Sequence, residues 1–245
     1  MKHINVSQLF QDYERDGVVR IRRLLTPDQV REIREELDRY IFEDLSGKPP
    51  DARTFEPDGK TVRNLWRLEQ HHPAIVPMLA QPEIVALASK LVKGEARLCG
   101  VETFNKPARI GSGVPYHQDN AYFCQTPSDM LTIWIAMDPV TLDNGPVYYV
   151  RGSHKAGLLP TKASGVNGNS MGLAEEPDIP LSQQFCGLLE PGDALIHHCE
   201  TIHHSAPNTS EHSRLGLLLV YRGTHTQSEP LLKAAYATAN LNSPV

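Results

Sequence analysis

The sequence predicts one domain that is mainly β with flanking α-helices. Apolar residues recur at helical spacing in the first third of the chain, whereas short β-rich runs separated by Gly, Pro, Asn and Asp follow from about Arg97. The 245 residues contain no internal repeat and no low-complexity linker. Strands at this spacing are typical of a barrel or sandwich. We therefore expect helical support over residues 1–95, the β core over 96–225 and a C-terminal extension over 226–245.

Helix signals in the first third are explicit. Ser7 is expected to cap a short helix that ends at Gly17. Thr26 opens a longer one, because a proline follows it and Gln29 completes a capping box. Between these helices "GVVRI" predicts a short strand, and residues 82–94 fit another helix that starts with proline and stops before glycine. The apolar stripe of the second helix comprises Val30, Ile33, Leu37, Tyr40 and Ile41.

The β-rich part contains five clear strand candidates and one long connection. The candidates are "RLCGVETF", "LTIWIAM", "PVYYV", "DALIHH" and "RLGLLLVYR". The connection runs from Lys155 to Gln184, and a second long segment without strand or helix signals runs from Ser46 to Asn64. Loops of this length in a compact domain are commonly functional lids. We expect both segments to be loops that cover a site.

Composition narrows the class of protein. The formal net charge of -5 provides no basic field for a nucleic acid. No apolar run reaches the roughly 20 residues of a membrane span, and the first residues lack the apolar stretch of a signal peptide, so we expect a cytoplasmic protein without a membrane partner. Its oligomeric state is not indicated. The cysteines are too far apart for a zinc knuckle or a disulfide framework: Cys99, Cys124, Cys186 and Cys199.

Two distant segments carry candidate metal ligands. In "VPYHQDNAYF" an imidazole and a carboxylate, His117 and Asp119, stand two positions apart and would share one face of a strand. Alone, such a pair is often a loop histidine beside a solvated aspartate. A second segment, Pro191 to Arg222, adds a histidine pair, a serine and an arginine that opens a strand. One more imidazole would complete the two-histidine, one-carboxylate triad of non-haem Fe(II) enzymes, and Arg214 has the planar fork that binds a carboxylate.

Five motifs together resemble the phytanoyl-CoA dioxygenase-like family of Fe(II)/2-oxoglutarate-dependent oxygenases. They are "DGVVRIRRLLTPDQVREIREELD", "NKP", "HQD", "DNGPVYYVRGSHKAG" and "IHHSAPN" followed by Arg214, and they occur in the family's order over nearly the whole chain. The resemblance implies a double-stranded β-helix, the jelly-roll or cupin-like core. It also implies Fe(II) as cofactor, with 2-oxoglutarate and O2 as co-substrates.

The family pattern assigns roles residue by residue. It makes His117, Asp119 and His203 the iron ligands. His204 occupies a position where the family commonly has a small residue, so it is the alternative third ligand. Neighbouring histidines have structural interpretations: His197 and His198 as hydrogen-bonded core or supporting residues, and His154, His71 and His72 as structural groups.

The same pattern implies a co-substrate pocket. Arg214 takes the position of the arginine that binds the distal carboxylate of 2-oxoglutarate, with Ser205 as a hydroxyl partner. Trp134 and Asn105 match positions that line the pocket, although a large aromatic residue in a strand is also an ordinary core residue.

The reaction that the resemblance implies is hydroxylation of an aliphatic C–H bond, with 2-oxoglutarate converted to succinate and CO2. Halogenases of this superfamily replace the carboxylate ligand by a small residue, whereas Asp119 is intact here. A non-catalytic cupin-like binding protein and a metal-dependent hydrolase or isomerase are alternatives that use the same triad. A zinc site made of Cys199 and His203 is disfavoured, because it lacks a second close ligand pair.

The substrate is expected to be a small polar or anionic molecule that is held by hydrogen bonds. No basic cluster suited to the phosphates of coenzyme A occurs, which disfavours an acyl-CoA. Polar and aromatic residues near the motifs are candidates for substrate contacts, with a purely loop-shaping role as the alternative: Tyr116, Asn120, Tyr122, Gln125 and Arg151.

Overall fold

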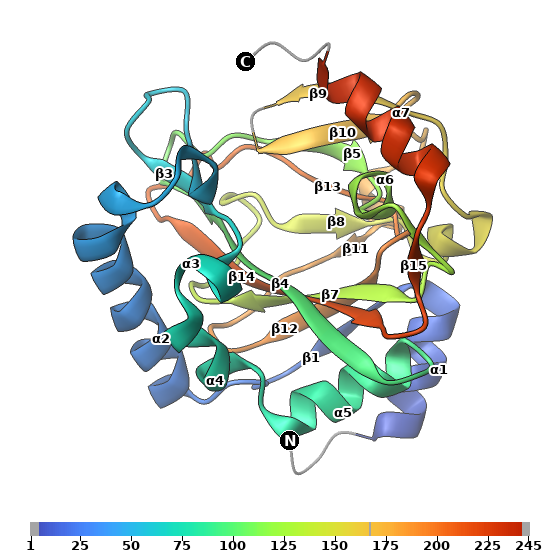
Figure 1. The fold of residues 1–245 in the computed structure, drawn as a ribbon, viewed down its shortest axis with the longest axis horizontal. Helices are drawn as coiled ribbons and strands as arrows, with labels where there is room; N and C mark the ends of the chain where they lie inside the picture. Colours follow the sequence, from blue (N-terminus) through green and yellow to red (C-terminus); the bar gives the residue numbers. More distant parts are fainter. Residues whose placement is uncertain (1–4, 167, 242–245) are drawn as a thin grey trace.

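The protein folds around two main antiparallel sheets, with two further two-stranded pairs, in a computed structural model that describes residues 5–166 and 168–241. The larger sheet contains, in spatial order, β1 (Val18–Ile21), β12 (Ala194–His198), β7 (Met130–Ala136), β14 (Arg214–Gly223), β4 (Ala96–Lys106), β3 (Val62–Leu65) and β2 (Arg53–Phe55). The smaller contains β11 (Phe185–Cys186), β8 (Val147–Tyr149), β13 (His203–Ser205) and β5 (Val114–His117). Figure 1 shows the smaller sheet lying above the larger one. The mainly β, jelly-roll class is thus confirmed.

Side chains alternate between the two faces of the larger sheet, and each face packs against a different part of the protein. Every residue of β7 is buried, because both faces of this strand are covered. Leu131, Ile133 and Ile135 pack with the helices in the main core. Trp134 and Ala136 point the other way and pack with residues of the smaller sheet, among them Tyr149. The space between the sheets is therefore lined by the even-numbered residues of β7.

Helices cover the outer face of the larger sheet: α1 (Val6–Asp16), α2 (Pro27–Arg39), α3 (Leu68–His71), α4 (Val76–Leu79) and α5 (Pro82–Leu91) (Figure 1). The capping box at Thr26 is confirmed. The prediction that Ser7 caps α1 was wrong, because Asn5 accepts the hydrogen bond from the Gln8 amide. Ile41 is also 38% exposed, since the chain leaves the α-helical path after Arg39 and the stripe loses its phase.

Both segments expected to be loops contain strands. The first includes β2 and the start of β3, which form a hairpin at the edge of the larger sheet. The second includes β9 (Thr161–Val166) and β10 (Asn169–Leu173), which pair with each other. The predicted C-terminal extension contains α7 (Pro230–Leu241), which Figure 1 places beside α6 (Asn120–Phe123). Other short elements are a π-helix at Tyr40–Asp44, 3-10 turns at Leu45–Gly47, Pro50–Ala52, Pro73–Ile75, Ser153–Ala156 and Leu181–Gln183, and the pair β6 (Gln125–Thr126) and β15 (Gln227–Ser228).

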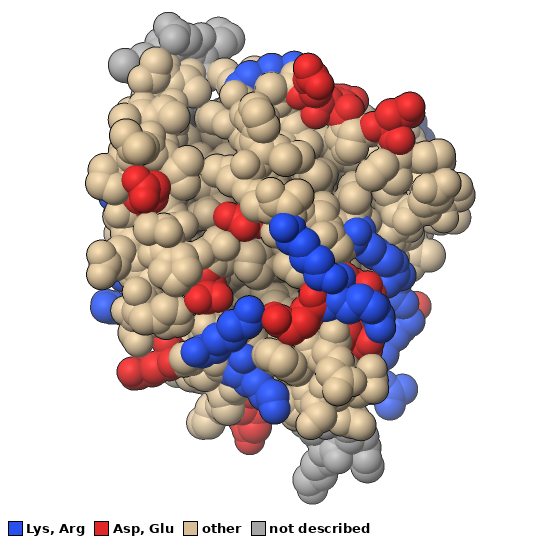
Figure 2. Space-filling view, turned by 90° about the vertical axis from the view of Figure 1, so that its right-hand side faces the viewer, with Lys and Arg blue, Asp and Glu red and all other residues tan. Residues whose placement is uncertain are grey.

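Acidic and basic side chains intermix on the face drawn in Figure 2, mostly in its lower half. Ion pairs that join opposite charges near the chain start include Lys93 with Glu14 and Arg15 with Asp12. Among the described helices, none alone has the length and apolar character needed to cross a membrane, and one pair bent by 78°, Pro73–Leu79 with Pro82–Leu91, meets that test jointly.

Candidate metal centre and cavity

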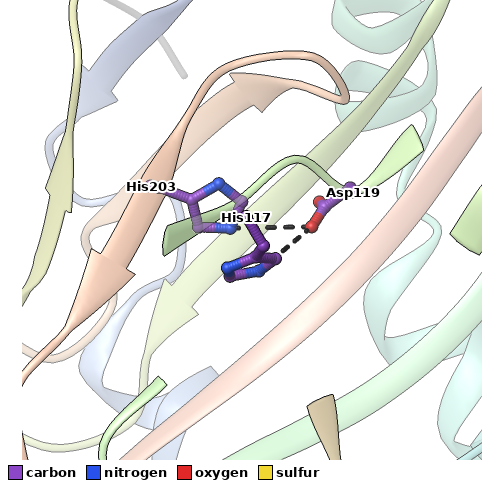
Figure 3. A group of neighbouring side chains, drawn as sticks. All are labelled: His117, Asp119 and His203. Atoms are coloured by element: carbon purple, nitrogen blue, oxygen red, sulfur yellow. Dashed lines mark ion pairs between the residues drawn. The ribbon is translucent and has the colours of Figure 1, made fainter. Parts of the chain in front are cut away.

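Three side chains, two from neighbouring strands and one from the start of α6, converge between the sheets (Figure 3). His117 is the last residue of β5, and His203 lies directly opposite it as the first residue of β13. Asp119 follows β5 and stands at the start of α6 in a helical conformation, so the expected strand alternation does not explain its direction. Asp119 Oδ1 lies 3.6 Å from His117 Nε2 and 3.5 Å from His203 Nε2. One ligand atom from each residue lies within 4.8 Å of the other two.

The protein backbone orients both imidazoles for metal binding. His117 Nδ1 lies 2.9 Å from the Pro115 carbonyl oxygen, and His203 Nδ1 lies 2.9 Å from that of Thr201. Each Nδ1 therefore donates a proton to a carbonyl, which leaves the lone pair of Nε2 facing the carboxylate. Burial lowers the pKa of His117 and of His203, so both rings are neutral at neutral pH. Neutral imidazoles with fixed lone pairs fit a divalent cation.

Hydrogen bonds hold the Asp119 carboxylate in place. Its Oδ1 accepts from the Tyr122 hydroxyl at 2.5 Å, and its Oδ2 accepts from the Thr132 hydroxyl at 3.0 Å. His197 Nε2 lies 3.1 Å from the same Oδ2. Burial alone would raise the pKa of Asp119, but the imidazoles of His203 and His197 outweigh it and hold this pKa below its ordinary value. The carboxylate is thus ionised, with Oδ1 turned toward the two histidines.

Arg214 supplies a buried cation in the same space. It is the first residue of β14 and is 1% exposed. Its Cζ lies 5.0 Å from the centre of the Trp134 ring, and its Nε and Nη1 bond no other described group. Burial lowers the pKa of Arg214 to about 10, which leaves it charged at neutral pH. A buried guanidinium with unused donors fits a carboxylate ligand.

These groups open into one cavity of about 600 Å³. Its wall includes the triad, Arg214 and Trp134 from the core of the fold, and Ser164, Gly165 and Val166 from β9. The segment around β2 adds Asp51 and Thr54, so both long segments contribute to the wall as expected. The cavity size is that of a pocket for a small organic molecule.

The predicted co-substrate residues divide into two groups. Ser205 and Trp134 line the cavity together with Arg214. Asn105 is not among the described residues that line it, because its side chain is on the other face of β4 and donates to the Val62 carbonyl. Strand alternation after Phe104, which does line the cavity, explains this difference.

Of the five candidates for substrate contacts, only Tyr122 is among the described residues that line the cavity. The Tyr116 hydroxyl accepts from Gln184. Asn120 donates to the Gln125 carbonyl and to Glu200, and so shapes the turn after the triad. Gln125 itself donates to the Phe123 carbonyl, and Arg151 pairs with Asp16 at 2.9 Å on the outside of the fold. These contacts agree with the alternative interpretation, in which the four residues shape the loops.

The alternative ligands lie apart from the triad. The centre of the His204 ring lies 3.9 Å from that of the Tyr116 ring at a tilt of 33°, and His204 Nε2 is 3.0 Å from Gln184 Oε1. Cys199 is buried, with its sulfur 3.1 Å from the Ser128 carbonyl oxygen. The metal-ligating group found among the described residues consists of His117, Asp119 and His203.

Several wall residues were not identified from the sequence. They include Glu102 on β4, the β9 residues and Tyr236 on α7. Glu102 had a usable signal, because it is an acidic residue inside a strand and shares the face of Phe104. Tyr236 and the β9 residues had none, since their sequence segments show no pattern that indicates contact with a distant triad.

The fold and the triad define the class: 2-oxoglutarate-dependent dioxygenases with non-haem iron. The chain belongs to the phytanoyl-CoA dioxygenase (PhyH) family, whose sequence model matches residues 13–216.

Individual relatives agree with this assignment. The chain is 26% identical to L-proline trans-4-hydroxylase from Streptomyces griseoviridis, over 89% of this chain and 87% of the relative. It is 25% identical to peroxisomal phytanoyl-CoA dioxygenase from Rattus norvegicus, over 85% of this chain but only 66% of the relative. Among solved structures, EctD from S. alaskensis with 2-oxoglutarate and 5-hydroxyectoine superimposes with a TM-score of 0.75 at 18% identity, covering 90% and 76% of the two chains.

Proposed function

We propose that the protein hydroxylates an aliphatic C–H bond of a small, polar metabolite, with His117, Asp119 and His203 as the iron ligands. The supporting observation is that the three ligand atoms and the unused donors of buried Arg214 open into one cavity. With iron and 2-oxoglutarate bound, reaction with O2 would yield succinate and CO2 and would supply the oxidant for the C–H bond. The protein's own side chains perform the other functions of the site.

In this proposal the protein binds, orients and shields. The Arg214 fork donates to the distal carboxylate of 2-oxoglutarate, and the neighbouring Ser205 hydroxyl donates to the same group. Trp134 lies against the guanidinium and limits its movement. The segments that close over the cavity exclude water and hold one C–H bond near the metal.

The wall supports a small substrate rather than an acyl-CoA. Among the described wall residues the only arginines or lysines are Arg67 and Arg214, and Arg67 is paired with Asp51. A coenzyme A phosphate group would need free cations at the rim. Two relatives, L-proline trans-4-hydroxylase and ectoine dioxygenase, are also named for compact polar molecules.

A spectroscopic experiment tests the proposed centre. Anaerobic protein given Fe(II) and 2-oxoglutarate should develop a weak visible charge-transfer band, because the 2-oxo acid chelates the ferrous ion. His117→Ala or Asp119→Ala should abolish the band, whereas His212→Ala, which alters an exposed histidine, should retain it. Absence of the band from iron-loaded wild-type protein would contradict the proposal. Oxygen-dependent succinate formation then separates an oxygenase from a hydrolase, an isomerase or an idle binding protein.

A further inference from the structure

Glu102 places a carboxyl group on the cavity wall. It lies on β4 opposite Leu218 of β14, and both side chains line the cavity. Phe104, two residues further along the same face, lines it as well. Strand alternation therefore fixes Glu102 toward the interior, on the same side of the sheet as the triad.

Glu102 is the wall carboxyl group that the protein leaves without a partner. It forms no hydrogen bond or ion pair with any described residue. The other two acidic side chains on the described wall are engaged, because Asp51 pairs with Arg67 and Asp119 accepts three hydrogen bonds. Glu102 is half-buried and lines the open cavity, so its unpaired carboxyl group is available to a ligand that enters there.

Among the described residues, those whose charges act on Glu102 are acidic. Burial raises the pKa of Glu102 to about 8, and the charges of Asp119 and Glu69 add to the shift. No arginine, lysine or histidine of the described part of the chain contributes to this shift. An ionised carboxylate at this place is costly until a positive charge arrives beside it.

The charges of the loaded centre leave Glu102 uncompensated. A ferrous ion and Arg214 bring positive charge, which the Asp119 carboxylate and the two carboxylates of 2-oxoglutarate balance. Aromatic residues also surround the space, among them Phe104, Tyr122 and Trp66. Aromatic faces attract cations and exclude water, which strengthens an ion pair formed there.

We propose that the substrate carries a basic nitrogen, an ammonium or amidinium group with at least one N–H, that donates to the Glu102 carboxylate. This assignment rests on the proposed function and names the substrate class of that same cavity. The nitrogen anchors the substrate on the β4 wall, and a carbon elsewhere in the molecule faces the triad.

Matched pairs of small molecules test the proposal. Anaerobic protein with Fe(II) and 2-oxoglutarate is titrated with cyclopentylamine against cyclopentanol, L-proline against tetrahydrofuran-2-carboxylate, and acetamidine against acetamide, within a wider library built on the same pairing. Binding is measured from the change in the visible band. Calorimetry measures the same binding without the band, so failure of the metal centre and failure of this assignment are distinguishable.

At least one nitrogen compound should bind tenfold or more tightly than its partner without the cation. Glu102→Gln should weaken its binding about tenfold to a hundredfold, the scale of a hydrogen bond to a charged group, and leave the partner compound unaffected. Glu35→Gln, which alters an exposed glutamate on α2, should bind like the wild type. Glu102→Asp keeps the charge and should retain part of the preference if Glu102→Gln fails to fold.

Three outcomes would overturn the assignment. The first is binding of the partner compounds as tightly as the cations, which would indicate a protonated Glu102 that donates to an oxygen. The second is an equal loss of binding for both members of a pair in Glu102→Gln, as for a purely structural residue. The third is failure of every nitrogen compound in the library to bind wild-type protein that shows the 2-oxoglutarate band.

Discussion

At Arg214, burial and unused hydrogen-bond donors occur in one side chain. A guanidinium that is 1% exposed, with Nε and Nη1 bonded to no described group, is costly in the absence of a ligand. The structure offsets part of this cost with Trp134, whose ring lies 5.0 Å from Cζ. The donors thus remain available for an anion from solution.

Arg214→Lys should weaken 2-oxoglutarate binding by about 1.5 to 3 kcal/mol. Lysine keeps the positive charge but loses the planar fork that donates two parallel hydrogen bonds. The dissociation constant is obtained by titrating the anaerobic Fe(II) protein with 2-oxoglutarate. Arg109→Lys, at an exposed residue paired with Glu211, is the matched control. Equal affinities for wild type and Arg214→Lys would remove the residue from this role.

Among the elements, β14 joins the core to the cavity. Leu217 and Leu219 pack with the outer helices, whereas Arg214 and Leu218 face the cavity. Gly216 lies between the two cavity residues and lets Trp134 approach the strand, because a Cβ at this position would lie 2.1 Å from Trp134 Cζ2. The missing side chain therefore helps to position the ring beneath Arg214.

Gly216→Ala should destabilise the protein by about 1 to 3 kcal/mol, the usual cost of overpacking, and should also weaken 2-oxoglutarate binding. The Trp134 ring must move, and the guanidinium that it supports moves with it. Urea denaturation gives the free energy of unfolding, and titration gives the affinity. In Gly100→Ala the new Cβ would lie 3.4 Å from Val220, an ordinary contact, so a small effect is expected. Similar losses in both variants would contradict this explanation.

At the scale of the whole molecule, buried histidines link stability to pH. Burial, aided by His154 and Lys93, lowers the pKa of His198 from 6.5 to about 4, despite the opposing charge of Asp129. Between these pH values the unfolded chain binds a proton that the folded protein does not. The free energy of unfolding must therefore rise with pH across this window and fall as the solution is acidified.

His198→Gln should reduce this pH dependence by as much as about 3 kcal/mol between pH 6.5 and 4. The remaining dependence belongs to other buried histidines, such as His117 and His203, whose pKa values are also lowered by burial. Urea denaturation of metal-free protein at several pH values measures the effect. His212→Gln should follow the wild-type profile. The explanation fails if His198→Gln gives a profile parallel to the wild type.

The sequence predicted those parts of the fold that have strong local patterns. The capping box at Thr26 and the apolar runs of β7 and β14 are examples, because their residues determine the local structure. The strands β2 and β9 were missed, since they are short, half-buried and rich in turn-forming neighbours. Asn105 was placed toward the cavity by family pattern, but the register of β4 turns it to the opposite face.

The order of the motifs in the sequence was enough to predict the three triad residues. Their geometry could be described only from the structure. The opposition of His203 and His117 depends on antiparallel pairing of strands separated by more than eighty residues, which no local pattern encodes. The hydrogen bond between His197 and Asp119 depends on the packing of β12 beside β7. Contacts of this kind follow from tertiary packing.

The outer cavity wall is assembled from segments that are remote along the chain: Thr54 on β2, Ser164 on β9 and Tyr236 on α7. The triad, by contrast, depends on β5, β13 and the turn between β5 and α6. Variation in the three wall segments can therefore diversify which compound is accepted while the oxidising centre stays the same. One fold can therefore accept many different metabolites through changes in its outer wall alone.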